Sequence, residues 1–595
     1  MTTSAPTLPS SSTSQRFGRL AQPILAALLM GILPQAGAQA GNGNGGEGPP
    51  GCPPGLAKKD NGCCPPGLAK KDNGCLPPGQ AKKRVLRVGT FRGIPGQFTS
   101  IQSAVDAANP GDWILVAPGD YHEQGDREHL LPGVASGGVY VGTPDLHLRG
   151  MDRNGVVVDG TKPGAPQCSS DPSDQDLGPL DSSGNALGRN GVLVFKADNV
   201  AVENLTACNF LDGSGGGGNQ IWWNGGDGSG QIGLGPYLGQ YLSATSTYFQ
   251  SAQQPKTEYG IFVSNSRGPG VIVHTYASNM ADSSYYIGAC PDCNAVLSDA
   301  HAQNSALGYS GTNSGGHLVI AYSEWDQNKT GISTNSQNND DAPSPQSGHC
   351  PDAEKGLAGN GLCTYFIGNY IHDNNNPNVP AVGSAALGPV GTGLIVSGGR
   401  FDTVAFNRVV HNGSWGLLLS PFPDSSNPPP PVANCAGGVV PQPSDPFPLG
   451  FLASIGVTCY FDDFGNEVHS NFLKDNGFFG NESNGDLGEI SGLNDPGNCW
   501  HGNVDPNGVT TSPADLQTTN GTCGVPNQGA GLLDPITQQL ICATQVFGPC
   551  TGLPGNPGYP QPTQVTLLPL PHEPSMKNPC EGVPANPWCK GGKPW

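Results

Sequence analysis

The sequence is poor in charged residues and in hydrophobic residues. Charged residues make up 12% and hydrophobic residues 36% of the 595 positions, while Gly (90) and Pro (58) are plentiful. Helical packing would need long runs of good helix formers, so this composition favours many short strands and turns. A chain this long is expected to hold several domains or one extended repeat array. The low hydrophobic content suits a slender solenoid whose coils each bury only a few side chains.

Apolar runs long enough to span a bilayer are also absent. The apolar stretch at 24–33 is shorter than the about 20 residues that a membrane span needs. Arg16 and Arg19 precede it, and the small-x-small site at 38–40 follows it, an order typical of a secretory signal. We predict that residues 1–40 are a signal peptide and that the mature protein is secreted, extracellular or cell-envelope associated, without a transmembrane segment.

All 18 cysteines lie after this signal. An even number of cysteines in an oxidising compartment predicts mostly disulfides. Cys290 and Cys293 could be read as a redox or metal pair, but no second such pair and no βαβ context accompany them. We predict that they close a short structural loop.

The segment 41–92 is a basic repeat region. The unit at 52–63 recurs identically at 64–75 and in truncated form at 76–83. A unit this small cannot bury a core, so each full copy is expected to close its own Cys–Cys loop. The segment holds nine Lys or Arg against three Asp or Glu, a net charge of +6, whereas residues 93–595 carry −28. A cationic tether on an acidic body predicts attachment to a cell-envelope polymer, or else a solubilising spacer.

A six-residue motif that ends in Asn recurs along the body of the chain. The third residue is usually apolar or aromatic, and neighbouring copies lie 25 and 24 residues apart where the repeat is cleanest. The copies span 204–209, 274–279, 299–304, 323–328, 369–374, 407–412 and 471–476. This spacing is about one coil of a β-helix and too short for a propeller blade. Stacked coils would place the Asn side chains in a column, where each amide can bond to the next coil.

A short amphipathic helix is expected ahead of the first strand. Ile101, Val105 and Ala108 have helical spacing, Asn109-Pro110-Gly111 ends the helix, and 113–117 reads as a buried strand. Such a helix would cover the open end of a solenoid. This stretch resembles the N-terminal cap of the pectin-lyase-like superfamily.

From 98 to about 479 the chain resembles the secreted bacterial β-helix-repeat proteins of that superfamily. The resemblance implies an all-β, right-handed parallel β-helix with an N-terminal capping helix, long loop insertions and irregular termini. We place it at 93–504, followed by a Pro/Gly/Cys-rich tail at 505–595. The resemblance also implies a protein that binds or cleaves polysaccharide. The polygalacturonase and epimerase motifs of the superfamily are absent.

Long spacings between the hexads predict loop insertions. Three of them are expected to wall a groove: 337–363, 375–389 and 421–460. A further Gly-rich insertion, within 208–259, carries aromatic residues that could stack on sugar rings or pack on one another. We predict four of these as substrate-binding residues: Trp222, Trp223, Tyr237 and Tyr241.

Hexad positions one, three and six are predicted to face inward, and positions two and four to face solvent. His301 and Trp325, at position three, are therefore expected in the core. Position two supplies Glu324, Tyr370, Arg408 and Phe472 on successive coils, and position four supplies Asp326, His372, Val410 and Lys474. The alternative to a functional site is that these are ordinary solvent-exposed residues on one face of the solenoid.

This outward face could support β-elimination on a uronic-acid glycan. A cation must neutralise the substrate carboxylate, which Arg408 or Lys329 could do, and His372 or Tyr370 could then abstract the acidified proton. Four carboxylates could hold Ca²⁺: Glu324, Asp326, Asp340 and Asp341. A hydrolase, which needs two carboxylates in range of the scissile bond, is the weaker enzyme hypothesis.

Two functions remain open from the sequence. One is a polysaccharide lyase acting on an acidic glycan, and the other is a non-catalytic surface adhesin or glycan-binding protein. Both take a polysaccharide or cell-envelope polymer as partner. Nucleic acid is not expected as a partner of so acidic a body.

Overall fold

The computed structural model describes residues 83–125, 134–229, 231–253, 255–290, 292–337, 363–425, 441–446, 449–491, 497–525, 535–546, 550 and 558–594. The predicted signal peptide and basic repeats, and the predicted metal ligands Asp340 and Asp341, lie outside these residues. No helix in the described part of the chain is long and apolar enough to cross a membrane.

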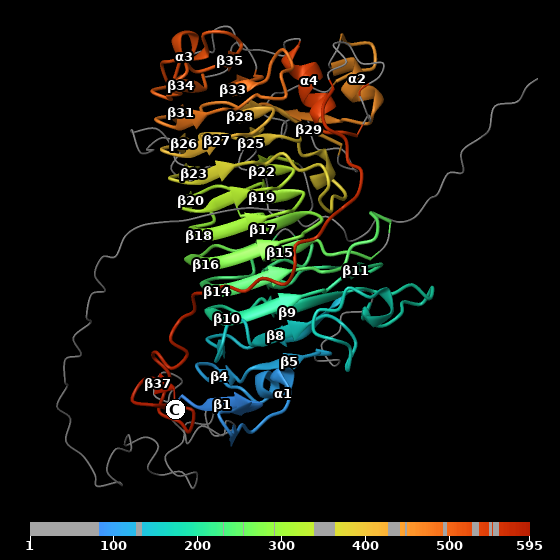
Figure 1. The fold of residues 1–595 in the computed structure, drawn as a ribbon, viewed down its shortest axis with the longest axis vertical. Helices are drawn as coiled ribbons and strands as arrows, with labels where there is room; N and C mark the ends of the chain where they lie inside the picture. The colour runs from blue at the N-terminus through green and yellow to red at the C-terminus, as the bar shows by residue number, and fades with distance from the viewer. Residues whose placement is uncertain are drawn as a thin grey trace, which may run out of the picture.

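Two long parallel sheets wind into a right-handed β-helix (Figure 1). The larger sheet has 18 strands: β1 (Val85–Val88), β4 (Trp113–Val116), β5 (Gly119–Tyr121), β7 (His147–Gly150), β8 (Val156–Asp159), β10 (Val200–Cys208), β14 (Tyr237–Thr245), β16 (Gly270–Ser278), β18 (Ala295–Gln303), β20 (Leu318–Ala321), β21 (Glu324–Asp326), β23 (Thr364–Ile367), β24 (Tyr370–His372), β26 (Thr403–Ala405), β27 (Arg408–Val410), β31 (Glu467–His469), β32 (Phe472–Lys474) and β34 (Cys499–His501). The other has 11: β6 (Ser136–Val141), β9 (Arg189–Phe195), β13 (Ile221–Asn224), β15 (Tyr259–Ser264), β17 (Ser283–Gly288), β19 (Leu307–Thr312), β22 (Thr330–Asn335), β25 (Thr392–Ser397), β28 (Trp415–Ser420), β33 (Gly485–Glu489) and β35 (Thr511–Ser512).

Short elements decorate this solenoid. The helices are α1 (Ile101–Asp106), α2 (Leu449–Ser454), α3 (Leu516–Thr519) and α4 (Ile536–Ala543). Four two-stranded antiparallel sheets among the described residues pair β2 (Thr90–Phe91) with β3 (Ile94–Pro95), β11 (Asp212–Gly213) with β12 (Gly216–Gly217), β29 (Phe422–Asp424) with β30 (Cys459–Phe461), and β36 (Cys589–Lys590) with β37 (Lys593–Pro594). Because β13 and β14 both pair within the long sheets, much of the segment 208–259 forms a coil of the solenoid, and its prediction as a loop insertion was wrong.

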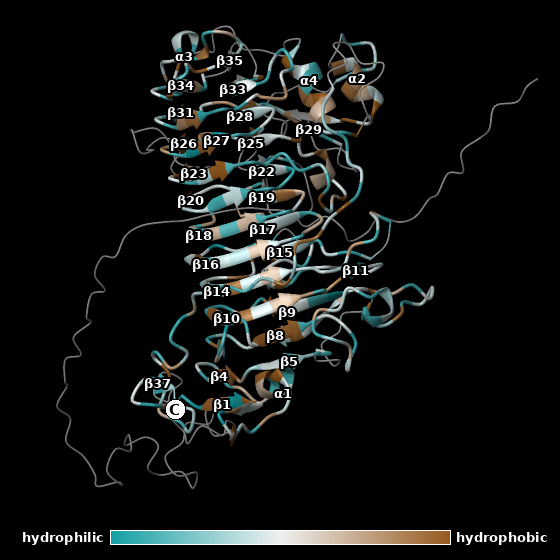
Figure 2. Ribbon diagram, in the orientation of Figure 1, coloured by the Kyte–Doolittle hydropathy of each residue, from teal (hydrophilic) through white to brown (hydrophobic). Residues whose placement is uncertain are grey.

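One apolar core runs inside the coils from end to end. It includes Trp325, which is fully buried as predicted, with Tyr285 and Tyr309 packed edge-on against its ring at 5.7 and 5.8 Å. Hydrophobic colour accordingly gathers on strands such as β8 and β23 (Figure 2). At the N-terminal end, α1 begins after Ser100, whose side chain accepts from the Ser103 N–H, and buries Ile101 and Val105 in this core. The predicted capping helix is confirmed.

The predicted asparagine column exists in the later coils. Asn328, Asn374, Asn412 and Asn476 are linked because each Nδ2 donates to the Oδ1 of the next at 3.1–3.2 Å. A parallel ladder joins the first hexad residues at 2.8–3.0 Å: Asn369, Asn407, Asn471 and, beyond the hexads, Asn503.

The earlier hexads are displaced by one residue relative to this ladder. Asn279 and Asn304 have positive φ and lie at the corner, where the later coils place Gln327 and Asp373 instead. The register pairs His301 with Glu324, so His301 faces outward and is partly exposed. Its prediction as a core residue was wrong because a one-residue shift in register turns a side chain to the opposite face of a strand.

Asp402 lies buried in a third ladder and predicts a pH effect on stability. Its Oδ1 accepts from the Thr364 N–H at 2.9 Å, its own N–H donates to Asn466 Oδ1 at 2.9 Å, and burial raises its pKa to about 7. The folded state therefore keeps a proton that the unfolded state releases at a lower pH, so stability falls as pH rises from about 4 to about 7.

We expect Asp402→Asn, which is neutral and of equal size, to stabilise the protein at pH 8 but much less at pH 5. Urea unfolding of the variant and the parent at both pH values measures this difference. The matched control is Asp475→Asn at an exposed carboxylate. An equal effect of Asp402→Asn at both pH values would contradict the assignment.

The chain after α4 returns along the outside of the solenoid. Figure 1 shows it in red, descending from α4 to β37 beside the first coils. Helix α4 packs on the outer face of β25 and β28 through Ile536 and Ala543. At the far end Trp588 and the Cys580–Cys589 disulfide pack on Trp113 in β4. The segment 558–594, here called the return strand, therefore touches coils at both ends of the helix.

Five disulfides join described cysteines, and none of the described cysteines is free. They are Cys168–Cys208, Cys290–Cys293, Cys499–Cys523, Cys542–Cys550 and Cys580–Cys589. The Cys290–Cys293 bond confirms the predicted structural loop. Disulfides at this density are typical of proteins that fold in an oxidising compartment.

Candidate functional site

A pocket of about 370 Å³ opens on the outer face of the 18-stranded sheet. Titratable side chains from several coils line it: His274, Asp299, His301, Glu324 and Tyr370. Arg153, Glu573 and Ser575 close one side, the last two coming from the return strand. Pockets where titratable groups converge are the default candidates for a binding or active site.

The sheet register sets one row of this site. Parallel pairing places Tyr276, His301, Glu324, Tyr370, Arg408 and Phe472 on successive strands at one position, here called the outer column. Successive strands lie about 4.8 Å apart, so side chains two coils apart are within reach of one sugar chain. The sequence predicted Glu324, Tyr370, Arg408 and Phe472 in this row. It missed His301, and also Tyr276, because the earlier hexads are displaced.

His372 lies in the neighbouring row and is held by two carboxylates. Its Nε2 is 3.1 Å from Glu324 Oε1, and its Nδ1 is 2.8 Å from Asp373 Oδ2. The Tyr370 ring stacks on it at 3.9 Å. Because a carboxylate contacts each ring nitrogen of His372, neither nitrogen is left to take a proton from a substrate, and the geometry gives His372 the role of positioning Glu324 and Tyr370.

His301 is the pocket group arranged to hold a proton. Desolvation lowers its pKa, but the hydrogen bond and charge of Asp326 outweigh that effect, and the net result is a raised pKa. Its Nε2 lies 2.8 Å from Asp326 Oδ1. His301 is therefore suited to donate a proton to a bound ligand near neutral pH.

Arg408 is the exposed cation of the outer column. Its guanidinium lies over the rings of Tyr370 and Phe472 at 5.3 and 5.5 Å. Among the described residues it makes no ion pair with a carboxylate. A guanidinium without an acidic partner is available to the carboxylate of a ligand.

Lys329, the other predicted cation, does not reach this site. It is buried, and its Nζ donates to the backbone carbonyls of Ala386 at 2.6 Å and Thr544 at 2.9 Å. Desolvation lowers its pKa to about 7. Its contacts join the coil to the loop before β25 and to the end of α4, which is a structural role.

Three of the four predicted stacking residues are buried. Trp223 is in the core with Tyr237 beside it. Trp222, the preceding residue of the same strand β13, packs outside this core, stacked on Phe262 at 4.8 Å with its Nε1 donating to Ser264. These three follow the alternative of aromatic self-packing. Tyr241 is partly exposed and stacks at 4.5 Å on His274, a pocket residue.

Sequence reasoning missed two exposed aromatic side chains beside the outer column. Tyr322 and Phe406 are 66% and 58% exposed, and Tyr322 lines the pocket. Both have positive φ at the corner before the hexad. The intervening coil has Gly368 at this corner, and a Cβ there would meet the Tyr322 ring at 2.6 Å. The sequence feature that could have identified them is an aromatic residue directly before the first position of a hexad.

The predicted calcium ligands are only partly free to bind a cation. Asp326 Oδ2 accepts from Gln303 and Gln327 at 2.8 and 3.1 Å, while Oδ1 faces His301. Within the described residues, Glu324 contacts His372 through Oε1 and has no other hydrogen-bond partner. In the described part of the chain, the groups close enough to share a metal do not include Glu324 or Asp326. Calcium at this site stays a prediction.

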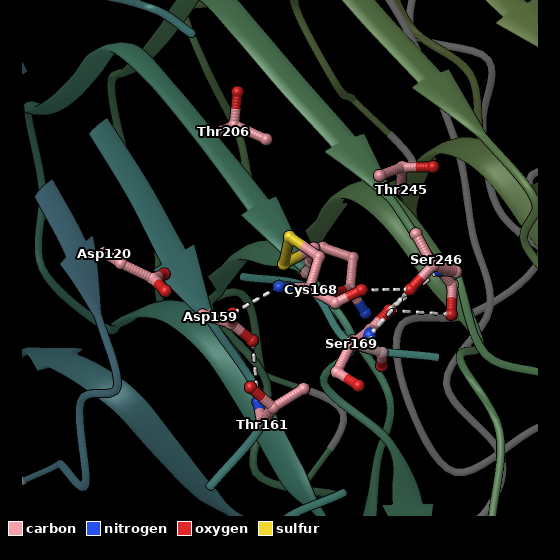
Figure 3. The surroundings of a disulfide bond; sticks show 12 residues. Asp120, Asp159, Thr161, Cys168, Ser169, Thr206, Thr245 and Ser246 are labelled. Atoms are coloured by element: carbon pink, nitrogen blue, oxygen red, sulfur yellow. Dashed lines mark hydrogen bonds between the residues drawn. A yellow bond between two sulfur atoms is a disulfide. The ribbon is translucent and has the colours of Figure 1, made fainter. Parts of the chain in front are cut away.

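A second carboxylate cluster lies by the Cys168–Cys208 disulfide (Figure 3). Asp159 accepts from the N–H groups of Thr161 and Cys168 at 2.8 and 2.5 Å. Desolvation and the nearby Asp159 charge raise the pKa of Asp120 to about 6. Because Asp159 is occupied by turn N–H groups, this cluster is a structural corner.

The fold is thus a right-handed parallel β-helix, with a pocket lined by titratable side chains on the outer face of its larger sheet. No family model matches the chain, and no curated protein matches it.

Solved structures give a fold-level likeness. The mannuronan C-5 epimerase AlgE4 A-module of Azotobacter vinelandii is 12% identical over 68% of this chain and 89% of its own, with a TM-score of 0.37. Pectate lyase Pel9A is 12% identical over 76% and 88%, at 0.34. The Dettilon tailspike protein is 13% identical over 68% and 62%, also at 0.34. These likenesses concern the fold alone.

Proposed function

We propose that the protein acts on a polysaccharide at the pocket and cleaves a uronic-acid glycan by β-elimination. The observation that carries the proposal is Arg408, an exposed guanidinium with no acidic partner among the described residues, seated over Tyr370. Neutralising a uronate carboxylate is the first need of this chemistry, because it acidifies the neighbouring C–H.

The residues divide the remaining steps between them. Tyr370, acting as the base through its phenolic oxygen, takes the proton from the carbon beside the carboxylate, and the electron pair of that C–H bond forms the new C=C bond. The glycosidic C–O bond then breaks. His301, whose protonated ring is stabilised by the hydrogen bond to Asp326, gives its proton to the leaving oxygen. Tyr322 and Phe406 offer exposed rings to neighbouring sugars.

Calcium is part of the same proposal. The body of the protein is strongly acidic, and a uronic-acid chain would be repelled by Glu324 and Asp299 near the pocket. Bound Ca²⁺ would bridge protein and substrate carboxylates, with Glu324 as the available protein ligand.

The exposed Tyr322 and Phe406 also favour a second function. A glycan-binding adhesin needs aromatic platforms and no proton transfer. This alternative predicts retention of a polysaccharide without any chemical change in it.

The test is incubation of residues 41–595 with a panel of uronic-acid polysaccharides, with and without Ca²⁺. We expect absorbance at about 235 nm to rise, because β-elimination creates an unsaturated end. New reducing ends without this absorbance would indicate a hydrolase. Retention on the glycan with neither product would establish the adhesin.

A further inference from the structure

The return strand covers one half of the outer column and leaves the other half open. The register extends the outer column upstream of Tyr276 to Ser243 and Thr206, and these three residues are buried. From Glu324 onward the column is partly exposed, and the Glu324 side chain is 45% accessible. The boundary between the two halves is the pocket.

Asparagine side chains fix the return strand in place. Asn279 donates to the Leu568 carbonyl at 2.9 Å and accepts from the Leu568 N–H at 3.0 Å. Asn154 clasps Glu573 in the same way, at 2.8 and 2.9 Å. Such paired bonds copy the pairing of a neighbouring β-strand, so they hold the backbone in register.

The clasps continue on the far side of the pocket. Asn204 donates to the Lys577 carbonyl at 2.8 Å and accepts from the Lys577 N–H at 2.9 Å. The buried Arg153 donates to the Leu242 carbonyl at 2.6 Å and to the Ser575 carbonyl at 3.3 Å, which joins strand and sheet beneath the pocket. The return strand is therefore fastened before, at and after the pocket.

Glu573 and Ser575 form the wall where the open half of the column ends. Arg153 lies 3.8 Å from the Glu573 carboxylate, which is one-quarter exposed toward the pocket. Beyond this wall the surface that a longer sugar chain would need is occupied by the return strand. On the other side of the pocket the row continues through Tyr370, Arg408 and Phe472, which are partly or fully exposed in the part of the chain that the structure describes.

We infer that the return strand makes the site end-specific: a glycan chain enters from the Phe472 side, and its terminal sugar stops against Glu573. The inference rests on the proposed function. A carboxylate at the wall accepts hydrogen bonds from the free hydroxyl groups of a terminal sugar, which an internal sugar lacks at the linkage. The protein would release short products from chain ends rather than cut within the chain.

The experiment uses short and long oligogalacturonates and alginate oligosaccharides, with the polymers, on the full-length mature protein. Calorimetry gives the number of proteins bound per chain, and chromatography with viscometry gives the product sizes. We expect one protein per chain at every length, short products from the start, and a viscosity that falls slowly.

Two variants test the wall itself. Glu573→Ala is expected to weaken binding of short oligosaccharides about tenfold or more, while Glu581→Ala, on the exposed part of the same strand, should not. A protein truncated after residue 557 lacks the return strand. Several copies of it should bind one long polysaccharide chain, and it should cut that chain internally. Glu573→Ala keeps the Asn154 clasp, because Asn154 bonds to the backbone of residue 573. This variant therefore tests the wall even if the truncated protein does not fold.

The outcomes separate the two claims. Internal cutting by the parent protein, or a number bound per chain that grows with length, would overturn end-specificity and leave the proposed function standing. Unchanged binding of short oligosaccharides by Glu573→Ala would overturn the role of the wall. Neither binding nor products with any uronic-acid chain would overturn both.

Discussion

Replacing Arg408 with alanine is expected to lower kcat/KM on the responsive uronic-acid polysaccharide by about 10²–10³-fold. Arg408 is exposed, lies over Tyr370 and has no acidic partner in the described part of the chain. Its removal leaves the substrate carboxylate without a neutralising charge in the transition state. The effect should fall mainly on kcat, because the charge that Arg408 stabilises grows as the proton leaves.

Two companion variants sharpen this prediction. Arg408→Lys keeps the charge but loses the two-pronged geometry, and should recover part of the activity. Lys474→Ala removes a cation from the next strand, one that is already paired with Asp475, and should change little. Equal losses in Arg408→Ala and Lys474→Ala would mean that only general surface charge matters.

Replacing Asn407 with alanine is expected to destabilise the fold by about 3 kcal/mol or more. The side chain is buried, and its Nδ2 donates to Asn471 Oδ1 and to the Phe366 carbonyl, both at 2.9 Å. Its Oδ1 accepts from the N–H and Nδ2 of Asn369 at 2.9 and 3.0 Å. Each buried group left without a partner costs about 1–3 kcal/mol.

Hydrogen exchange is the appropriate readout, because the coils of a solenoid can open separately and one global midpoint can miss a local effect. Faster exchange should be confined to β23, β24, β26 and β27 and their neighbours. The matched control is Val410→Ala, a partly exposed position on the same coil, which should leave exchange nearly unchanged. Unchanged protection in Asn407→Ala would contradict a ladder that stabilises the coils.

The sequence determined the repeat and therefore the architecture. The hexads at 323–328, 369–374 and 407–412 carry their asparagines in phase, so position two of each hexad could be assigned to one outward row. The helix at α1 and the strand at β4 followed from spacing and from the Pro-Gly stop. These features are local: they depend on side-chain period and on turn residues close together in the chain.

Only the tertiary structure decided the composition of the pocket. His301 lies in the outer column because its hexad pairs with the next coil one residue out of phase. Packing between the coils sets this register, and the hexad sequence does not. Trp222 and Lys329 were expected at the site because of their chemistry, but burial gave them structural partners.

The return strand is the clearest case of a feature decided in three dimensions. Glu573 lines a pocket with His301 and Glu324, more than two hundred residues away in sequence, and no period links them. The sequence by itself determined the coils, because each coil repeats a local pattern. Tertiary contacts decided what lies on their surface, because the asparagine clasps that fix the return strand act between segments with no common pattern.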